Sequence, residues 1–200
     1  MQAAGYGYAY PALRYGIAHL SVTMTIVLET DRLTLRRPTT DDASFFLTLV
    51  NQDSWLHYIG DHEVYDIPAA IDYILDGPIA MLEEFGYALC VMELKPGGPP
   101  IGLCGVVKRD GLALPDLGFA LIDAYAGKGY ASEAARACMT LARDTLKIPT
   151  LLAMALPSNQ RSIRLLTRLG FRDLGTFRLN SNNPVTKLFE CTLQQQAGQA

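Results

Sequence analysis

Long apolar runs and an excess of basic residues are both missing from the sequence. No stretch reaches the roughly 18 apolar residues that indicate a transmembrane helix, and the closest candidate, residues 13–28, is interrupted by Arg14 and His19. Lys and Arg number 17 against 20 Asp and Glu, a net charge of −3, whereas nucleic-acid-binding domains normally carry a basic patch. We therefore expect neither a membrane nor a nucleic acid as a partner.

Cysteine pairs at metal-binding spacing are also absent. The four cysteines are Cys90, Cys104, Cys138 and Cys191. None forms a Cys-x-x-Cys pair, and the three histidines lack metal spacing as well. Each cysteine lies in an apolar run, where a free thiol behaves as a small hydrophobic side chain. We predict reduced cysteines, no metal and a cytoplasmic location.

The chain does have enough apolar residues for a packed domain. Half of its 200 residues are hydrophobic and 18% are charged, which excludes a disordered chain, a coiled coil and a disulfide scaffold. Residues 1–23 contain four tyrosines but no acid. We interpret them as an N-terminal extension, with an arm packed through its tyrosines as the alternative. We expect one domain over residues 24–193 and a frayed tail over 194–200.

Strand and helix patterns alternate along this domain. Strands are predicted over residues 33–36, 87–94, 101–108, 112–122, 150–156, 171–178 and 187–193. Helices are predicted after Thr40 or Asp41, from Pro68, and over 131–146 and 160–169. Residues 53–67 look irregular, Gly77-Pro78 must kink or split a helix, and Pro115 requires an edge or a bulge. This order indicates a mixed α/β sheet with helices on both faces.

A glycine-containing turn opens the predicted helix at 131. Its sequence is Tyr125-Ala-Gly-Lys-Gly-Tyr-Ala-Ser-Glu-Ala134. Gly127 and Gly129 permit backbone conformations that a Cβ would block, and a helix start offers unpaired N–H groups and the positive end of a dipole. The segment predicts a binding site for a phosphate or pyrophosphate, with a plain tight turn as the alternative. It matches neither the Walker loop nor the dinucleotide-binding fingerprint.

A second motif follows about thirty residues later. It is Pro157-Ser-Asn-Gln-Arg-Ser-Ile-Arg-Leu-Leu-Thr-Arg-Leu-Gly-Phe171. Asn159 is suited to cap a helix and Gly170 to end it. The two motifs in this order resemble those of the GNAT acyltransferase superfamily. The segment Leu28-Glu-Thr-Asp-Arg-Leu-Thr-Leu-Arg-Arg37 is similar to the opening of its ribosomal-protein serine/alanine N-acetyltransferase branch.

The resemblance covers about residues 25–193 and implies a GNAT-like fold. In that fold a mostly antiparallel central sheet is splayed at the cofactor site, and acetyl-CoA is the donor. The pyrophosphate would be held by backbone N–H groups of Gly127, Lys128, Gly129, Tyr130 and Ala131. The pantetheine arm and thioester would meet main-chain groups of Leu121 and Ile122.

The resemblance also implies roles for the second motif. Asn159 and Ser162 match positions that usually face the cofactor or the acceptor, with simple helix capping as the alternative. Arg161, Arg164 and Arg168 share one helical face. A solvated face is the favoured interpretation of these arginines, and contact with the 3′-phosphate of CoA is the alternative.

Two positions depart from the superfamily pattern. Ala124 stands where Gln or Arg is common, which removes one side-chain contact but leaves the backbone site intact. Leu166 stands where a tyrosine often protonates the leaving thiolate. Either another group or solvent must then supply that proton.

Acetylation of an amine requires its neutral form, so a base must collect a proton. Asp116 is the first candidate, with an exposed carboxylate at a strand start as the alternative. His57 and Glu63 are weaker candidates from the segment 53–67, where specificity is expected to lie. Trp55 and Tyr58 could line an acceptor pocket, although half-buried packing is the favoured interpretation.

The sequence therefore predicts an acetyl-CoA-dependent N-acetyltransferase that works by direct attack of a primary amine. The catalytic candidates are Asp116, Asn159 and Ser162. The acceptor is a protein N-terminus or a small molecule, and the mild acidity slightly favours a cationic one. The alternative is a catalytically silent CoA-binding sensor or interaction module, suggested by Leu166. A nucleotide-binding protein is a third hypothesis, and the oligomeric state is left open between monomer and homodimer.

Overall fold

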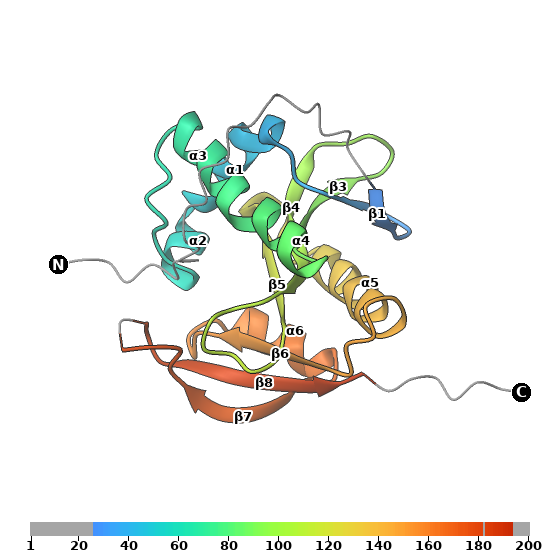
Figure 1. Ribbon diagram of the computed structural model, residues 1–200, viewed down its shortest axis with the longest axis vertical. Coiled ribbons are helices and arrows are strands. Elements are labelled where there is room, and N and C mark those ends of the chain that lie inside the picture. The colour runs from blue at the N-terminus through green and yellow to red at the C-terminus, as the bar shows by residue number, and fades with distance from the viewer. Residues whose placement is uncertain (1–25, 182, 194–200) are drawn as a thin grey trace, which may run out of the picture.

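A single eight-stranded sheet organises the molecule (Figure 1). The computed structural model describes residues 26–181 and 183–193, so the predictions for residues 1–23 and 194–200 lie outside the described residues. The strands are β1 (Ile26–Glu29), β2 (Leu33–Arg36), β3 (Leu89–Leu94), β4 (Pro100–Val107), β5 (Asp116–Leu121), β6 (Thr150–Ala155), β7 (Arg172–Phe177) and β8 (Thr186–Thr192). Their order in the sheet is β1-β2-β3-β4-β5-β6-β8-β7.

Helices cover both faces of this sheet, as the alternation of patterns predicted. They are α1 (Ala43–Val50), α2 (Asp53–Tyr58), α3 (Ile67–Ile74), α4 (Ala80–Phe85), α5 (Tyr130–Asp144) and α6 (Gln160–Arg168), with short turns η1 (Thr40–Asp42), η2 (Leu75–Ile79) and η3 (Asp123–Tyr125). Cys90 and Cys104 point to the face that α5 covers, whereas Val91 and Leu103 point to the face of α1 and α3. Successive side chains alternate across a strand, so both faces acquire an apolar core.

Strands β5 and β6 part from each other in the middle of the sheet. They form the only parallel pair among the described strands, and their register contains one residue pair, Asp116 with Leu152. The N–H of Leu152 donates to the carbonyl of Pro115 at 2.9 Å. Beyond this point no described strand pairs with the β6-facing edge of β5. The sheet is therefore mostly antiparallel and splayed at one place, as the resemblance implied.

Two expectations for local structure need correction. Residues 53–58 form α2 rather than an irregular segment, because burial of Trp55, which is 4% exposed, stabilises a helix too short to show a periodic pattern. The strand predicted from residue 112 begins only at Asp116, so Pro115 precedes it. Gly77 and Pro78 lie in η2, a π-helical turn between α3 and α4, which confirms the predicted interruption.

Within residues 26–181 and 183–193, no helix is both long enough and apolar enough to cross a membrane. The longest of the described helices is α5, which presents small side chains to the sheet. Ala134, Ala135, Cys138 and Ala142 are buried there. Small residues let the helix approach the sheet closely, which fixes where its first turn lies relative to the end of β5.

Candidate active site

A cavity of about 550 Å³ opens where β5 and β6 separate. Its walls come from both strands, the first turn of α5, the start of α6 and the helix α2. Candidates from both sequence motifs line it together with Asp116, although they lie far apart in the chain: Gly127, Gly129, Ala131, Asn159 and Ser162. A concave, mostly preformed site of this size is typical of small-molecule binding.

The turn before α5 has the backbone geometry of an anion-binding site. Gly127 and Gly129 have φ of +78° and +87°, a region that glycine adopts without strain. The first helical hydrogen bond runs from the N–H of Glu133 to the carbonyl of Gly129 at 3.1 Å. The preceding N–H groups of the first turn consequently have no acceptor within the helix. Ala131 lines the cavity with the two glycines.

Not every residue predicted for this turn faces the cavity. Lys128 and Tyr130 are not among its lining residues, whereas Ser132, which the sequence did not single out, is. The ammonium of Lys128 lies 5.3 Å from the ring centroid of Tyr125. The side chains of Lys128 and Tyr130 thus pack around the turn rather than into the cavity.

An ion pair between Arg32, in the connection from β1 to β2, and Glu133, in the first turn of α5, stabilises the turn. Glu133 accepts hydrogen bonds from the hydroxyl of Thr30 at 2.6 Å, from the N–H of Arg32 at 2.9 Å and from its Nε at 2.6 Å. Arg32 also donates to the carbonyl of Lys128 at 3.1 Å, and its guanidinium lies 4.6 Å from the Tyr130 ring centroid. Burial alone would raise the pKa of Glu133, but these hydrogen bonds outweigh it and lower the pKa.

The free edge of β5 presents backbone groups to the cavity. The N–H of Ile122 donates to the carbonyl of Ile101 on β4 at 2.8 Å, so Ile122 faces away from the gap. Because backbone groups point to alternate sides of a strand, those of Phe119 and Leu121 face it. Of the two predicted pantetheine contacts, only Leu121 therefore lies on the cavity side. Phe119 is a cavity-facing residue that the sequence did not suggest.

Gln52 links α2 to the end of β5. Its Nε2 donates to the carbonyl of Leu121, and its Oε1 accepts from the N–H of Asp123, both at 2.8 Å. Gln52 is also the N-cap residue of α2. The side-chain amide thereby fixes α2 over the cavity.

Asp116 lies at the point where the strands part. It is 1% exposed, which rules out the alternative of an exposed carboxylate. Arg109 Nε donates to its two oxygens at 2.9 and 3.1 Å. Burial raises the pKa of Asp116, and the charge of Arg109 opposes this effect only in part. Asp116 is therefore a paired carboxylate in the cavity wall.

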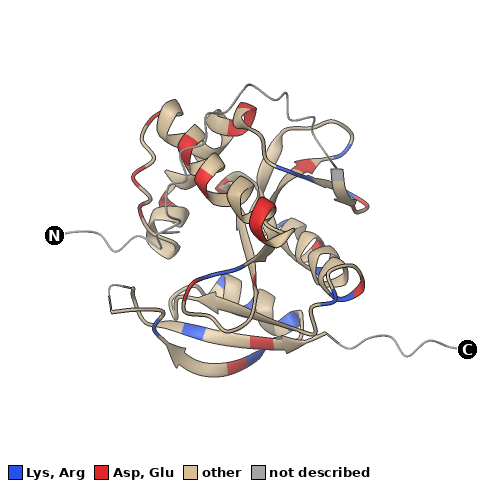
Figure 2. Ribbon diagram, viewed as in Figure 1, with Lys and Arg blue, Asp and Glu red and all other residues tan. Residues whose placement is uncertain are grey.

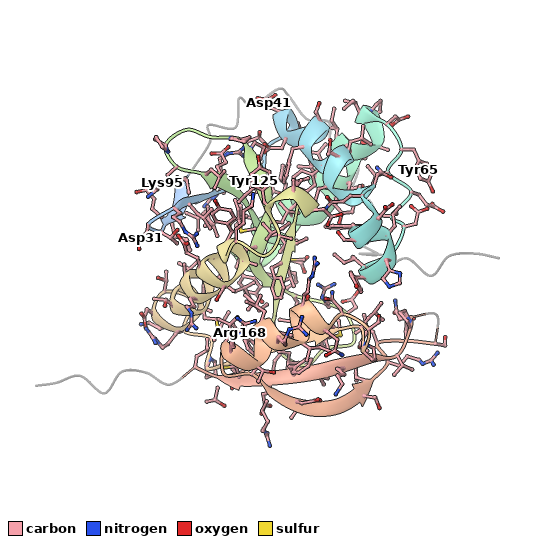
Figure 3. The ribbon with its side chains drawn as sticks, turned by 180° about the vertical axis from the view of Figure 1, so that it is seen from behind. Asp31, Asp41, Tyr65, Lys95, Tyr125 and Arg168 are labelled. Atoms are coloured by element: carbon pink, nitrogen blue, oxygen red, sulfur yellow. The ribbon has the colours of Figure 1, made fainter. Side chains whose placement is uncertain are left out.

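At the start of α6, Asn159 Oδ1 accepts a hydrogen bond from the N–H of Ser162 at 3.1 Å. This is the capping role, and both residues also line the cavity. Arg161, Arg164 and Arg168 are exposed and belong to the same wall. Basic positions on α6 are visible in Figure 2, and Figure 3 shows Arg168 on this helix. Leu166 is 1% exposed and packs in the core.

Four aromatic residues line another part of the cavity. They are Trp55, Tyr58, His62 and Tyr73, which we call the aromatic chamber. Ring centroids are 5.7 Å apart for Trp55 and His62 and 5.4 Å apart for His62 and Tyr73, in edge-to-face arrangements. Burial, helped by the nearby charge of Arg109, lowers the pKa of His62 to about 4.

Among the weaker sequence candidates, His57 and Glu63 do not line the cavity, whereas Trp55 and Tyr58 do. His62 and Tyr73 were missed as site residues. The signal that could have found them is the aromatic content of residues 53–73. Which of those rings meet depends on how α2 and α3 each pack against α1.

Comparison with known proteins identifies the family. Residues 32–172 match the family model of the acetyltransferase (GNAT) domain, and the chain belongs to this family. The protein YkkB of Bacillus subtilis (strain 168) is 28% identical over 162 residues, which cover 79% of this chain and 91% of YkkB.

Solved structures share the fold. An acetyltransferase from Agrobacterium tumefaciens superposes with a TM-score of 0.71 at 24% identity, covering 89% of this chain and 99% of that one. RimL, a ribosomal L7/L12 α-N-protein acetyltransferase in complex with coenzyme A, gives 0.70 at 17% identity, covering 84% and 98%. The predicted superfamily and fold are confirmed, and a ribosomal-protein acetyltransferase is among the structural neighbours.

Proposed function

We propose that this protein is an acetyl-CoA-dependent N-acetyltransferase that acts by direct attack of a primary amine on the thioester. The observation that carries the proposal is one cavity that follows β5 from Asp116 to Leu121 and reaches the glycine turn before α5. It joins an anion-binding helix start, a free strand edge and an aromatic chamber. A donor and an acceptor could meet there without a covalent enzyme intermediate.

The residues present fit coenzyme A. The unpaired N–H groups of the first turn of α5 suit a diphosphate. The arginines on α6 add positive charge to the same cavity, so the alternative role predicted for Arg161, Arg164 and Arg168, contact with the 3′-phosphate, gains support. When bound, acetyl-CoA supplies an acetyl group activated as a thioester.

Main-chain donors and a buried carboxylate would perform the chemistry. The N–H of Phe119 faces the cavity and is placed to stabilise negative charge that develops on a carbonyl oxygen. Asp116 would take the proton of the attacking amine, directly or through a water. A carboxylate has about four lone-pair sites, of which Arg109 occupies two. A raised pKa brings Asp116 closer to the range that suits a general base.

Asn159 and Ser162 are proposed as positioning residues. The capping bond between them fixes the first turn of α6, which belongs to the cavity lining. The thiolate leaving group would then be protonated by solvent, because Leu166 offers no acidic group. Cytoplasmic location, the absence of a metal, and a monomeric or homodimeric state stay predictions.

The test combines binding and turnover. Calorimetry with acetyl-CoA measures donor binding, and CoA release is followed over a panel of amines and peptides with free N-termini. We expect acetyl-CoA to bind, ATP not to displace it, and at least one amine to be acetylated. Equal binding of ATP and acetyl-CoA would contradict the proposed donor.

The burial of Leu166 favours one second candidate, a CoA-binding sensor without turnover. In that case acetyl-CoA binds and stabilises the protein, yet no amine of the panel is acetylated. Turnover that exceeds the uncatalysed rate for any acceptor excludes the sensor.

A further inference from the structure

The aromatic chamber leaves two buried polar atoms without a partner. Trp55 Nε1 and His62 Nε2 have no hydrogen-bond partner among the described residues. A buried donor or acceptor without a partner is costly in an apolar site. Both residues line the cavity. A ligand that brings one hydrogen-bonding group into an apolar surrounding would satisfy one of these two atoms.

The chamber also lacks the charges that would attract a polycation. Asp116 is the carboxylate beside it, and this residue is paired with Arg109. The other acidic residue of the cavity lining, Asp123, lies beyond the end of β5. The lining holds four arginines but only these two aspartates. The net negative charge of the chain therefore does not extend to the cavity.

The rings themselves provide a surface for a planar apolar group. Trp55 is buried, and His62 lies edge-to-face between Trp55 and Tyr73. Offset and edge contacts between aromatic rings add favourable interaction energy to that gained from the area that the rings bury. Arg109, whose charge acts on His62, pairs with Asp116, and all three residues line the cavity. A ligand bound to these rings would thus have its polar end near the residue proposed as base.

Building on the proposed function, we propose that the acceptor is a primary amine carried on an aromatic body, which the aromatic chamber binds in preference to a polycation. The ring of the acceptor packs on Trp55 and Tyr73, and its amine donates to His62 Nε2. The protonated amine loses one proton to Asp116, and the nitrogen lone pair that this frees bonds to the thioester carbonyl carbon. The carbon–sulfur bond then breaks, and the second nitrogen proton passes through solvent to the departing thiolate. The products are an arylalkyl acetamide and CoA.

Tryptophan fluorescence offers a direct measurement of acceptor binding, because Trp55 is the single tryptophan of the chain. The full chain is first saturated with CoA, and acetyl-CoA binding is measured separately by calorimetry. The CoA-saturated chain is then titrated with 2-phenylethylamine or with spermidine while the emission of Trp55 is recorded. We expect a saturable change with 2-phenylethylamine and a dissociation constant at least about tenfold lower than that of spermidine.

Two variants locate the binding surface. Tyr73→Leu should weaken 2-phenylethylamine binding about tenfold, and His62→Phe should retain ring contacts but lower kcat/KM. Tyr65→Leu is the matched control, because Tyr65 is 67% exposed and lies at the periphery of the molecule (Figure 3). It should bind 2-phenylethylamine as the unmodified chain does.

The outcomes separate this inference from the proposed function. Spermidine binding as tight as 2-phenylethylamine binding, or no emission change with 2-phenylethylamine, overturns the inference even when acetyl-CoA binds. A failure of acetyl-CoA to bind in calorimetry rejects the proposed function itself. Acetylation of 2-phenylethylamine with a higher kcat/KM than spermidine supports both.

Discussion

At the scale of single residues, the ion pair between Asp116 and Arg109 lies where β5 and β6 part. In this pair the carboxylate of Asp116 is buried and can still accept a proton. The ionised form is stabilised by Arg109, while burial disfavours it and raises the pKa of Asp116. This combination of burial and ion pairing is what the proposed role of Asp116 as a general base requires.

Asp116→Asn should lower kcat about 100-fold or more, because general-base catalysis contributes at least that much. Acetyl-CoA affinity should change little, since the substitution leaves the glycine turn untouched. Steady-state kinetics and calorimetry measure the two effects. The control Asp173→Asn removes an exposed carboxylate of β7, which is paired with Lys187 of β8, and should affect neither quantity. Equal losses of kcat and affinity, or no loss of kcat, would reject Asp116 as the base.

The buried imidazole of His62 predicts a pH dependence of stability. Its pKa is about 4 in the folded protein, against 6.5 for an unperturbed histidine, so the unfolded chain binds the proton more readily. The stabilising contribution is complete above pH 6.5 and is lost as the pH falls toward 4. Arg109 and Asp61 are the charged groups that act on His62, in opposite directions.

Urea unfolding of the unmodified chain and of His62→Phe between about pH 7 and 4 tests this dependence. As the pH falls through the lower part of that range, the unfolding equilibrium constant of the unmodified chain should rise more steeply than that of His62→Phe. The difference should reach up to about tenfold per pH unit. His57→Phe, which alters an exposed histidine outside the cavity, is the control. Parallel pH profiles for His62→Phe and the unmodified chain would show that folding does not lower the pKa of His62.

At the scale of secondary-structure elements, the turn before α5 and the ion pair behind it form one unit. The backbone of the turn has the geometry to bind an anion, and the Glu133–Arg32 pair holds the turn against the connection between β1 and β2. The backbone conformation of the turn and its stabilisation by the ion pair can be tested separately.

Gly127→Ala should raise the dissociation constant of acetyl-CoA. Its φ of +78° disfavours any residue with a Cβ, at a cost of about 1–2 kcal/mol. Gly175→Ala on β7 is a matched control, because φ there is +99° and an added Cβ meets no atom within 4 Å at either position. Both variants should lose similar stability in thermal unfolding, and only Gly127→Ala should weaken acetyl-CoA binding in calorimetry. Equal affinity of the two variants would place the diphosphate elsewhere.

Glu133→Ala should weaken acetyl-CoA binding about tenfold, which corresponds to about 1.4 kcal/mol, with little change in kcat. The substitution removes the acceptor of three hydrogen bonds and releases Arg32 from the turn. Asp144→Ala, at the other end of α5, removes an exposed carboxylate paired with Arg143 and should leave affinity unchanged. An unaltered acetyl-CoA affinity in Glu133→Ala would mean that the turn keeps its shape without this support.

At the scale of the whole molecule, the cavity divides the sheet between β5 and β6. A ligand that fills it contacts both halves and stabilises only the folded state. At a concentration about 100 times its dissociation constant, acetyl-CoA should add about 2.7 kcal/mol of stability. For a chain of this size that corresponds to a rise in Tm of about 5–11 °C. Thermal unfolding with acetyl-CoA and with ATP checks this, and an equal rise with ATP would favour a nucleotide-binding protein.

Local sequence was sufficient for the features that depend on neighbouring residues. The positive φ of Gly127 and Gly129, the cap that Asn159 provides and the start of α5 within one residue of its predicted position all follow from short-range preferences. The mixed sheet with helices on both faces followed from the order of patterns.

Only the tertiary structure decided how the part of the cavity around Asp116 and the aromatic chamber is built. Arg109 neutralises Asp116 across a connection that carries no periodic signal, and His62 meets Trp55 and Tyr73 because α2 and α3 pack on one face of the sheet. The six residues of α2 are too few to show helical periodicity, so this helix depends on the burial of Trp55. Backbone preferences act between neighbours and are encoded locally, whereas ion pairs and ring contacts form only when distant segments are brought together.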